Sequence, residues 1–240
     1  MKNMREEIIT IPTLDDHLIY GTLITSATKN NPLIIFVHGI TGSQYEQHYI
    51  RAPYYFCPKG FNVFRFDQYS REKKARRLTE CSISIHAQDL NEVVKHFSDE
   101  YETIHLVGHS LGALVVLKSD LKRIAKTVLV DPSRGMNNLE EKNITYDKEK
   151  KQYVYNRGIE ILMGQAMIDE WMEAANLQPY VDKIKQPCKF IFAGNSELSK
   201  RWIPHIKGME QVTVPGAGHC FYEIGTTETL FEEIYAFLKK

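Results

Sequence analysis

The sequence predicts one α/β domain built on a doubly wound, mostly parallel sheet. Three observations predict it. Short apolar runs alternate with helix-type stretches, most of these runs are unbroken, and Gly, Pro or Asp residues bound them. Unbroken apolar runs suit strands that are buried on both faces, as in a parallel sheet. The chain has 240 residues, 43% of them hydrophobic, which is enough for one sizeable core.

Eight strands are expected along the chain. Residues 8–11 and 18–25 flank a largely polar turn and predict an antiparallel hairpin. The other six strands are expected at 33–38, 61–67, 103–108, 126–131, 189–194 and 211–214. Apolar residues at helical spacing predict helices over 86–98, 110–118 and 227–238. Strands that alternate with helices in this way are typical of a doubly wound fold.

Residues 132–187 interrupt the alternation, because they contain no convincing core strand. ITYDKEKKQYVY predicts a charged hairpin with its turn near 147–150, and an amphipathic helix is expected after it. The apolar face of that helix would carry Ile161, Leu162, Met167, Ile168 and Trp171. A plain crossover needs only about a dozen residues. We therefore expect a cap between the sixth and seventh strands, with 1–131 and 188–240 as the core; the alternative is a surface excursion.

Composition excludes several classes of protein. Lys+Arg and Asp+Glu both number 30, and no patterned basic surface indicates nucleic-acid binding. The longest apolar runs are too short to span a bilayer, and residues 1–12 lack the apolar core of a signal peptide. Four scattered cysteines without a C-x-x-C pair favour reduced thiols over a disulfide scaffold or zinc site. We expect a cytoplasmic monomer or homodimer, with the basic run 71–77 as a solvated loop.

The pentapeptide Gly108-His109-Ser110-Leu111-Gly112 joins an expected buried strand to an apolar helix. A serine nucleophile must project from a very tight strand-to-helix turn, where its backbone is strained. Glycines two residues to either side remove the collisions that side chains would make there. The turn also directs the Leu111 amide and the helix N-terminus at the serine, where they would stabilise a negatively charged oxygen.

With this motif in place, the sequence resembles the α/β-hydrolases over nearly its whole length. That family places the nucleophile after the fifth of eight core strands, and the count agrees if the N-terminal hairpin supplies the first two. The stretch 39–43, GITGS, follows the expected third strand and resembles the HG-x-x-G loop of the family. The resemblance implies that the backbone N–H groups of Ile40 and Leu111 form an oxyanion hole.

The resemblance also implies a general base and an acid. The family carries the base in the loop after the last strand, which here holds His219. The acid usually follows the seventh strand, where Glu197 falls at the matching position. Asp131 competes with it, since some members carry the acid after the sixth strand. His109 is expected to pack or orient at the substrate site.

These residues predict a serine hydrolase that cleaves carboxylic esters of small acyl or aryl groups through an acyl-enzyme intermediate. Such a mechanism requires no metal and no cofactor. The narrower resemblance is to small bacterial carboxylesterases and to the feruloyl esterase and serine aminopeptidase-like group. Met163, Met167 and Trp171 are expected to bring sulfur and aromatic surface to the pocket, or to dock the cap on the core.

Two other functions stay open. A thioesterase or monoacylglycerol-type lipase would be favoured by an apolar tunnel beneath the cap. A non-catalytic ligand-binding protein on the same fold is the second alternative, although such a protein has no need of the serine, the histidine and both oxyanion loops together.

Overall fold

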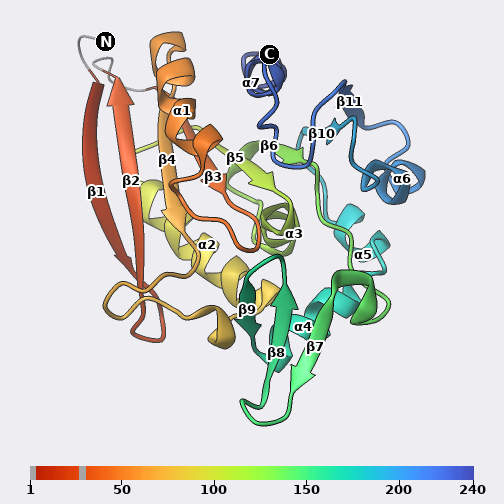
Figure 1. Ribbon diagram of the computed structural model, residues 1–240. Helices are drawn as coiled ribbons and strands as arrows, with labels where there is room; N and C mark the ends of the chain where they lie inside the picture. Colours follow the sequence, from red (N-terminus) through yellow and green to blue (C-terminus); the bar gives the residue numbers. More distant parts are fainter. Residues whose placement is uncertain (1–3, 27–30) are drawn as a thin grey trace.

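An eight-stranded sheet runs through the centre of the computed structural model, which describes residues 4–26 and 31–240 (Figure 1). Its strands lie in the order β1-β2-β4-β3-β5-β6-β10-β11. All neighbours from β4 to β11 are parallel, whereas β2 is antiparallel to both β1 and β4. The bounds of these strands are β1 Met4–Pro12, β2 Leu18–Ser26, β3 Leu33–Val37, β4 Asn62–Asp67, β5 Ile104–His109, β6 Ile124–Val130, β10 Cys188–Ala193 and β11 Glu210–Val214.

The predicted sheet is confirmed. The six later strands lie within two residues of their expected ends, because most of them are apolar runs that are buried on both faces of the sheet. The exception is β11, which lies at the edge and is mostly exposed. Residues 33–37, 62–67 and 188–193 are buried along their whole length. The N-terminal hairpin is longer than predicted, because the charged residues at 5–7 extend β1 along the exposed edge of the sheet.

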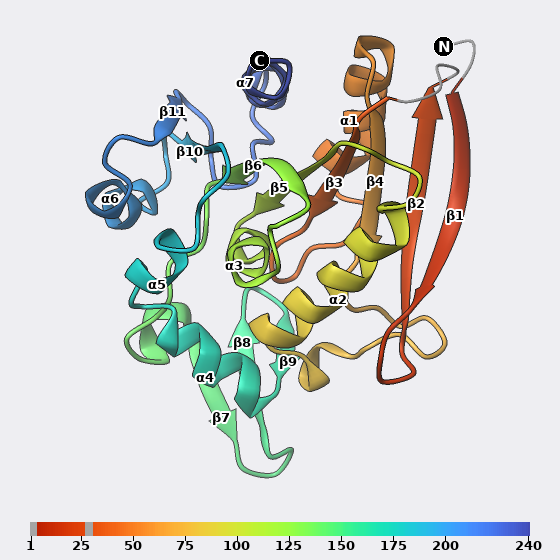
Figure 2. The ribbon, with the colours of Figure 1, turned by 180° about the vertical axis from the view of Figure 1, so that it is seen from behind.

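Helices cover both faces of the sheet. α1 (Gln47–Phe56) and α7 (Thr226–Leu238) pack against one face, and α2 (Ile83–Phe97) and α3 (Leu111–Lys118) pack against the other (Figure 2). The three predicted helices are therefore present as α2, α3 and α7. α1 was not predicted, because Pro53 lies inside it and a proline argues against a helix interior. Within residues 4–26 and 31–240, no helix has the length and apolar character to cross a membrane.

The segment between β6 and β10 forms a smaller layer of its own. It contains the antiparallel sheet β7-β8-β9 and the helices α4 and α5. In Figure 2, α4 lies beside the lower end of α2, and α5 packs beside α3. The hairpin expected near 147–150 is β7 (Ile144–Asp147) and β8 (Gln152–Asn156). β9 (Glu160–Met163), α4 (Gln165–Glu173) and α5 (Gln178–Val181) follow, and the short helix α6 (Ser199–Trp202) comes after β10.

The amphipathic helix expected in this segment is shorter than predicted. Ile161 and Leu162 belong to β9, and the helix begins only at Gln165. Gly164 separates the two elements, because its backbone lies against Thr79: a Cβ at this position would be 2.2 Å from the Thr79 carbonyl oxygen. Only a glycine can lie this close to Thr79, and at this residue the chain changes from strand to helix instead of forming one uninterrupted helix.

The basic run 71–77 is not a wholly solvated loop. Arg76 is buried and donates hydrogen bonds to both carboxylate oxygens of Asp89 on α2, at 2.6 and 2.9 Å. It also donates to both carboxylate oxygens of Asp15, at 2.7 and 2.8 Å. The guanidinium therefore joins the N-terminal hairpin to α2, which is a structural use of this charge.

Candidate active site

The turn at Ser110 has the strained geometry that its motif predicts. Ser110 follows β5 directly and adopts φ 55° and ψ −121°, which lies in the region that favours glycine. A Cβ on Gly108 would lie 2.7 Å from the Gly112 carbonyl oxygen, and one on Gly112 would lie 2.3 Å from the Val37 carbonyl oxygen. The two glycines therefore let the strand, the turn and α3 approach closely enough to place the serine at the sheet edge.

Hydrogen bonds connect the serine to a histidine and then to a carboxylate. The Ser110 hydroxyl lies 2.9 Å from Nε2 of His219, and Nδ1 of His219 lies 2.5 Å from Oδ2 of Asp131. Asp131 is fully buried at the end of β6, and it accepts a second bond at Oδ1 from the Ala193 N–H, at 3.2 Å. In this arrangement Nδ1–H donates to Asp131, which leaves Nε2 free to accept the serine proton.

The structure corrects the acid expected from the sequence. Glu197 is 79% exposed and pairs with Lys200, and no hydrogen bond joins it to His219 in the described part of the chain. The reason is local. The chain turns outward after β10 and leads into α6, so the position that matches the common family pattern faces solvent. Asp131, the competitor at the end of β6, lies against His219 instead, with φ 38° turning it toward the loop.

Two backbone amides lie beside the serine. The loop that contains Ile40 runs against the nucleophile, because a Cβ on Gly39 would be only 2.8 Å from the Ser110 Cβ. Leu111 is the first residue of α3. Neither amide donates to another backbone carbonyl within 4–26 and 31–240, so both are free to donate to a substrate oxygen. His38 holds this loop in place, since Gln68 donates its backbone and side-chain N–H groups to it, at 3.0 and 2.6 Å.

His109 holds the loop of His219 through a hydrogen bond to the backbone. Its Nε2–H donates to the carbonyl oxygen of His219 at 2.8 Å, and the two rings lie 4.8 Å apart. Burial lowers the pKa of His109 well below its usual value, so the ring stays neutral. His109 also contributes to the cavity wall beside Ser110, which agrees with a packing or orienting position.

A cavity of about 250 Å³ opens in front of Ser110. A larger hollow of about 690 Å³ lies on the other side of the loop, lined by residues such as Gln44 and Tyr45, but it contains no nucleophile–base pair. We therefore place the candidate site in the smaller cavity, where Ser110, His219 and Ile40 meet.

The expected residues of the insertion divide into two groups. Trp171 lines the cavity, and its indole N–H donates to the Ser133 hydroxyl at 3.2 Å. Met163 and Met167 do not line it, because both are fully buried in the core cluster that docks the insertion. The expectation that these two methionines contact a substrate is therefore wrong, and the docking alternative describes them.

Glu46, His48 and His109 form a cluster of metal-ligand type beside the cavity. One ligand atom from each lies within 4.8 Å of the others, and Oε2 of Glu46 and Nδ1 of both histidines have no hydrogen-bond partner in the described residues. Ligand atoms around a tetrahedral zinc ion lie about 3.4 Å apart, given bonds of about 2.0–2.1 Å. Binding a zinc ion would therefore require the three ligand atoms to lie closer together than they do in this structure.

Glu46 gives the site a pH-dependent charge. Burial raises the pKa of its carboxyl to about 7, and His219 partly opposes this. Glu46 becomes negative as the pH rises through this value. It lies on the loop that also carries Ile40, and there its charge opposes an oxyanion.

We expect kcat/KM for a neutral ester to fall about fivefold above pH ~7. E46Q should lose this fall at high pH and keep the dependence of kcat/KM on pH in the acidic range. A pH–rate profile of both proteins tests this; identical profiles would contradict it.

Three charged residues of the site were not predicted from the sequence: Glu46, Lys142 and Arg157 all line the cavity. Glu46 follows the GITGS loop without belonging to a motif. Lys142 and Arg157 belong to the charged insertion, where residues of both signs occur. Composition and spacing carry no signal for them, because only the folded insertion brings them to the serine.

Comparisons with known proteins agree with this fold. The model of the alpha/beta hydrolase family matches residues 34–224. The structure of Est1E from Butyrivibrio proteoclasticus with ferulic acid bound is similar at a TM-score of 0.78 and 20% identity, covering 97% of this chain and 100% of that one. The structure of the Pyrococcus furiosus esterase Pf2001 is similar at a TM-score of 0.70 and 20% identity, covering 98% of this chain and 92% of that one. The structure of an esterase from Exiguobacterium antarcticum is similar at a TM-score of 0.71 and 15% identity, covering 96% of this chain and 99% of that one. None of the curated proteins matches the sequence.

Proposed function

The chain belongs to the alpha/beta hydrolase family, and from this premise we propose that it hydrolyses carboxylic esters with small acyl or aryl groups. Ser110 is the nucleophile, His219 the general base and Asp131 the acid. The observation that supports this most strongly is the unbroken pair of hydrogen bonds through His219, at 2.9 Å to Ser110 and 2.5 Å to Asp131. The triad geometry of serine hydrolases has the same order of partners.

The proposed reaction has two similar halves. His219 Nε2 takes the hydroxyl proton as Ser110 Oγ attacks the ester carbonyl carbon. The oxygen becomes negatively charged and is stabilised by the N–H groups of Ile40 and Leu111. His219 then gives its proton to the departing alcohol, which leaves an acyl-enzyme. A water molecule, deprotonated by His219, releases the acid in the same way, while Asp131 stabilises the transient imidazolium.

The proposed substrate size follows from the cavity. Its volume of about 250 Å³ is below the range of about 300–1,000 Å³ typical of pockets for drug-sized ligands. Met163 and Met167, which would have supplied flexible apolar surface, are buried elsewhere. Both observations favour short acyl or single-ring groups over the long chains of a lipase. In this proposal residues 132–187 act as the cap, because Lys142, Tyr155, Arg157 and Trp171 close the cavity from that side.

Esters of p-nitrophenol with acyl chains from two to sixteen carbons test the proposal. We expect the highest kcat/KM at chains of about six carbons or fewer, because longer chains exceed the cavity. A fluorophosphonate probe, which phosphonylates an activated serine with loss of fluoride, should label the protein in the same preparation. The neighbouring residue Ser133 supplies a matched check, since peptide mapping must find the label on Ser110 and not there.

Absence of both labelling and turnover would overturn the proposal and favour a ligand-binding protein. An optimum at sixteen carbons would keep the serine hydrolase but reject the assignment to small esters. Labelling and turnover with thioesters of the same acyl groups, at a higher kcat/KM than the oxygen esters, would favour the thioesterase alternative.

A further inference from the structure

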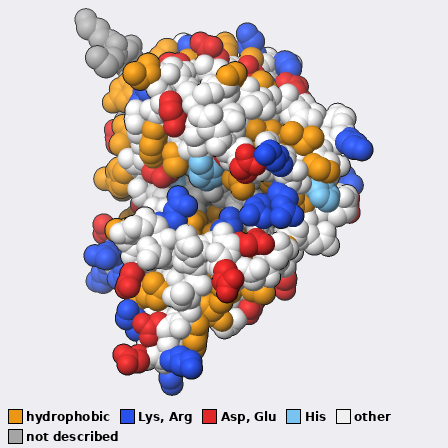
Figure 3. Space-filling model, turned by 45° about the vertical axis from the view of Figure 1, so that its right-hand side comes forward, with side chains coloured by type: hydrophobic (Ala, Val, Ile, Leu, Met, Phe, Trp, Pro, Cys, Tyr) orange, Lys and Arg blue, Asp and Glu red, His pale blue; other side chains and the backbone are white. Residues whose placement is uncertain are grey.

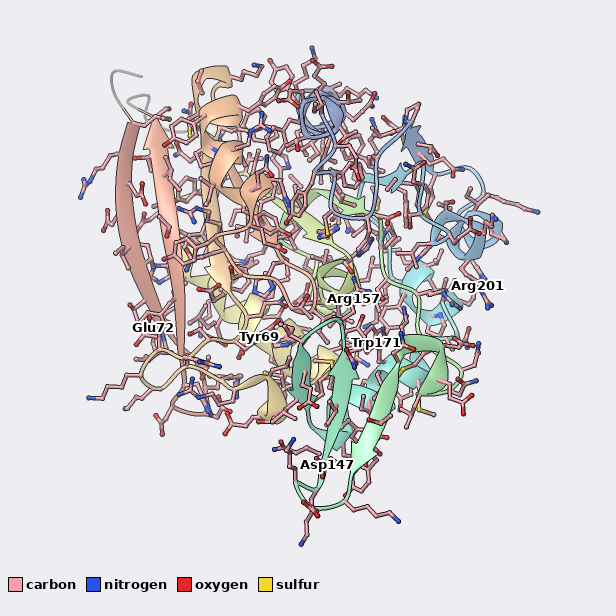
Figure 4. The ribbon with its side chains drawn as sticks, viewed as in Figure 1. Tyr69, Glu72, Asp147, Arg157, Trp171 and Arg201 are labelled. Carbon is pink, nitrogen blue, oxygen red and sulfur yellow. The ribbon has the colours of Figure 1, made fainter. Side chains whose placement is uncertain are left out.

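Two cationic side chains of the insertion close the cavity over the nucleophile. Lys142 ends the short helical turn Glu140–Lys142 before β7, and Arg157 lies in the turn between β8 and β9. Figure 4 shows Arg157 at the end of the small sheet that faces the main sheet, close to Trp171, whereas Asp147 lies at the opposite tip. On the space-filling surface, Lys and Arg side chains gather beside a hollow that borders a histidine (Figure 3).

Contacts fix Lys142 relative to the serine. Its Nζ lies 5.3 Å from the centre of the Trp171 ring. The Trp171 indole donates to the Ser133 hydroxyl, and the Ser133 N–H donates to the Ser110 carbonyl oxygen at 2.9 Å. Lys142 is thus attached to the nucleophile turn through two hydrogen bonds and one cation–π contact. Arg157 sits over the Tyr155 ring, 5.8 Å from its centre.

Neither cation has a carboxylate partner in the described residues, although the nearby Arg134 has one. Arg134 pairs with Glu141 at 3.4 Å, while Lys142 and Arg157 form no ion pair. Burial and the neighbouring Arg134 lower the pKa of Lys142, which is the environment of an ammonium group that lacks a counterion. Lys142 is half-buried, so its lack of a partner costs free energy that a bound anion would offset, whereas Arg157 is exposed and adds a second positive charge to the cavity wall.

The only carboxylate among the described cavity-lining residues is that of Glu46. The described lining of the cavity therefore holds two cationic side chains against one carboxylate. A neutral ester would leave both cations unmatched, whereas an ester with an anionic group would satisfy them.

We propose that the physiological substrate is an ester that carries an anionic group, a carboxylate or a phosphate, bound by Lys142 and Arg157. This inference rests on the proposed ester hydrolysis and names the substrate class of the same site. The anion lies either on the acyl part or on the alcohol part of the ester. A planar guanidinium and a flexible ammonium suit an oxygen anion that approaches from outside the cavity.

Matched ester pairs test this inference separately from the esterase activity. Mono-p-nitrophenyl esters of glutaric, adipic and suberic acid place a carboxylate on the acyl part, and the methyl ester of each is its neutral partner. 4-Acetoxybenzoate and methyl 4-acetoxybenzoate form the pair for the alcohol part. We expect kcat/KM for the anionic member to exceed that of its neutral partner about tenfold in at least one pair, and less so at high salt.

K142Q and R157Q should each reduce this ratio by about threefold to tenfold. K148Q is the control, since Lys148 lies beside Asp147 at the far tip of the same small sheet and should leave the ratio unchanged. Because the ratio compares two substrates on one protein, a partly unfolded variant lowers both rates and does not alter it. Arg157 is exposed, so its replacement should leave the fold intact.

The outcomes are distinguishable. Neutral esters cleaved as fast as anionic ones in every pair would overturn this inference and leave the proposed hydrolase standing. No cleavage of any ester would overturn both. An anionic preference that K142Q and R157Q leave unchanged would also reject it, because the selectivity would then come from other residues.

Discussion

Replacing Ser110 by alanine is expected to remove ester hydrolysis, with kcat falling by at least about 10⁴-fold. The variant lacks the only hydroxyl that lies within hydrogen-bond distance of His219 Nε2, at 2.9 Å, among the described residues. The backbone amides of Ile40 and Leu111 would remain, so a small residual rate from oxyanion stabilisation and binding is expected. Steady-state kinetics with a short p-nitrophenyl ester measure the effect.

S119A is the matched control for this variant. Ser119 lies at the other end of α3, where its hydroxyl donates to the Val116 carbonyl oxygen, at a distance from the site. It should retain wild-type kcat. Circular dichroism should show the same fold for both variants, since alanine keeps the backbone of the turn. Hydrolysis by S110A within about tenfold of the wild-type rate would reject Ser110 as the nucleophile.

The sheet could be predicted because each core strand is a short apolar run with clear ends. Residues 33–37 and 104–109 are buried on both faces, so their hydrophobicity reports their position directly. α1 could not be predicted, because Pro53 suggests a break and only packing against the sheet compensates. β9 was assigned to a helix, because the backbone contact between Gly164 and Thr79 is invisible in the sequence.

The site was predictable to the extent that it is local. Ser110 and its two glycines form one turn, and the spacing of a strained turn is readable from five residues. The acid is not local, because it depends on which of two strand ends lies beside the His219 loop. The charged wall of Lys142 and Arg157 depends on how the insertion folds back over the core, which no short pattern encodes.

D131N is expected to lower kcat about 10⁴-fold, whereas E197Q should change it by less than about twofold. The Asp131 carboxylate accepts the Nδ1–H of His219, which leaves Nε2 as the acceptor for the serine proton. An asparagine at this position can present its N–H₂ group to the ring and stabilise the tautomer with the proton on Nε2. That tautomer cannot accept the Ser110 proton.

Comparing D131N with E197Q in one assay tests which of the two carboxylates acts as the acid. Glu197 is exposed and pairs with Lys200, so removing its charge should affect neither His219 nor the fold. D131N retains an oxygen that can accept the Ala193 N–H, and this limits any disturbance of β10. A loss confined to E197Q would mean that the His219 loop moves to Glu197 during turnover. A loss confined to D131N, with labelling by the fluorophosphonate slowed to the same extent, would assign the acid to β6 and explain why the outward turn after β10 carries no catalytic group.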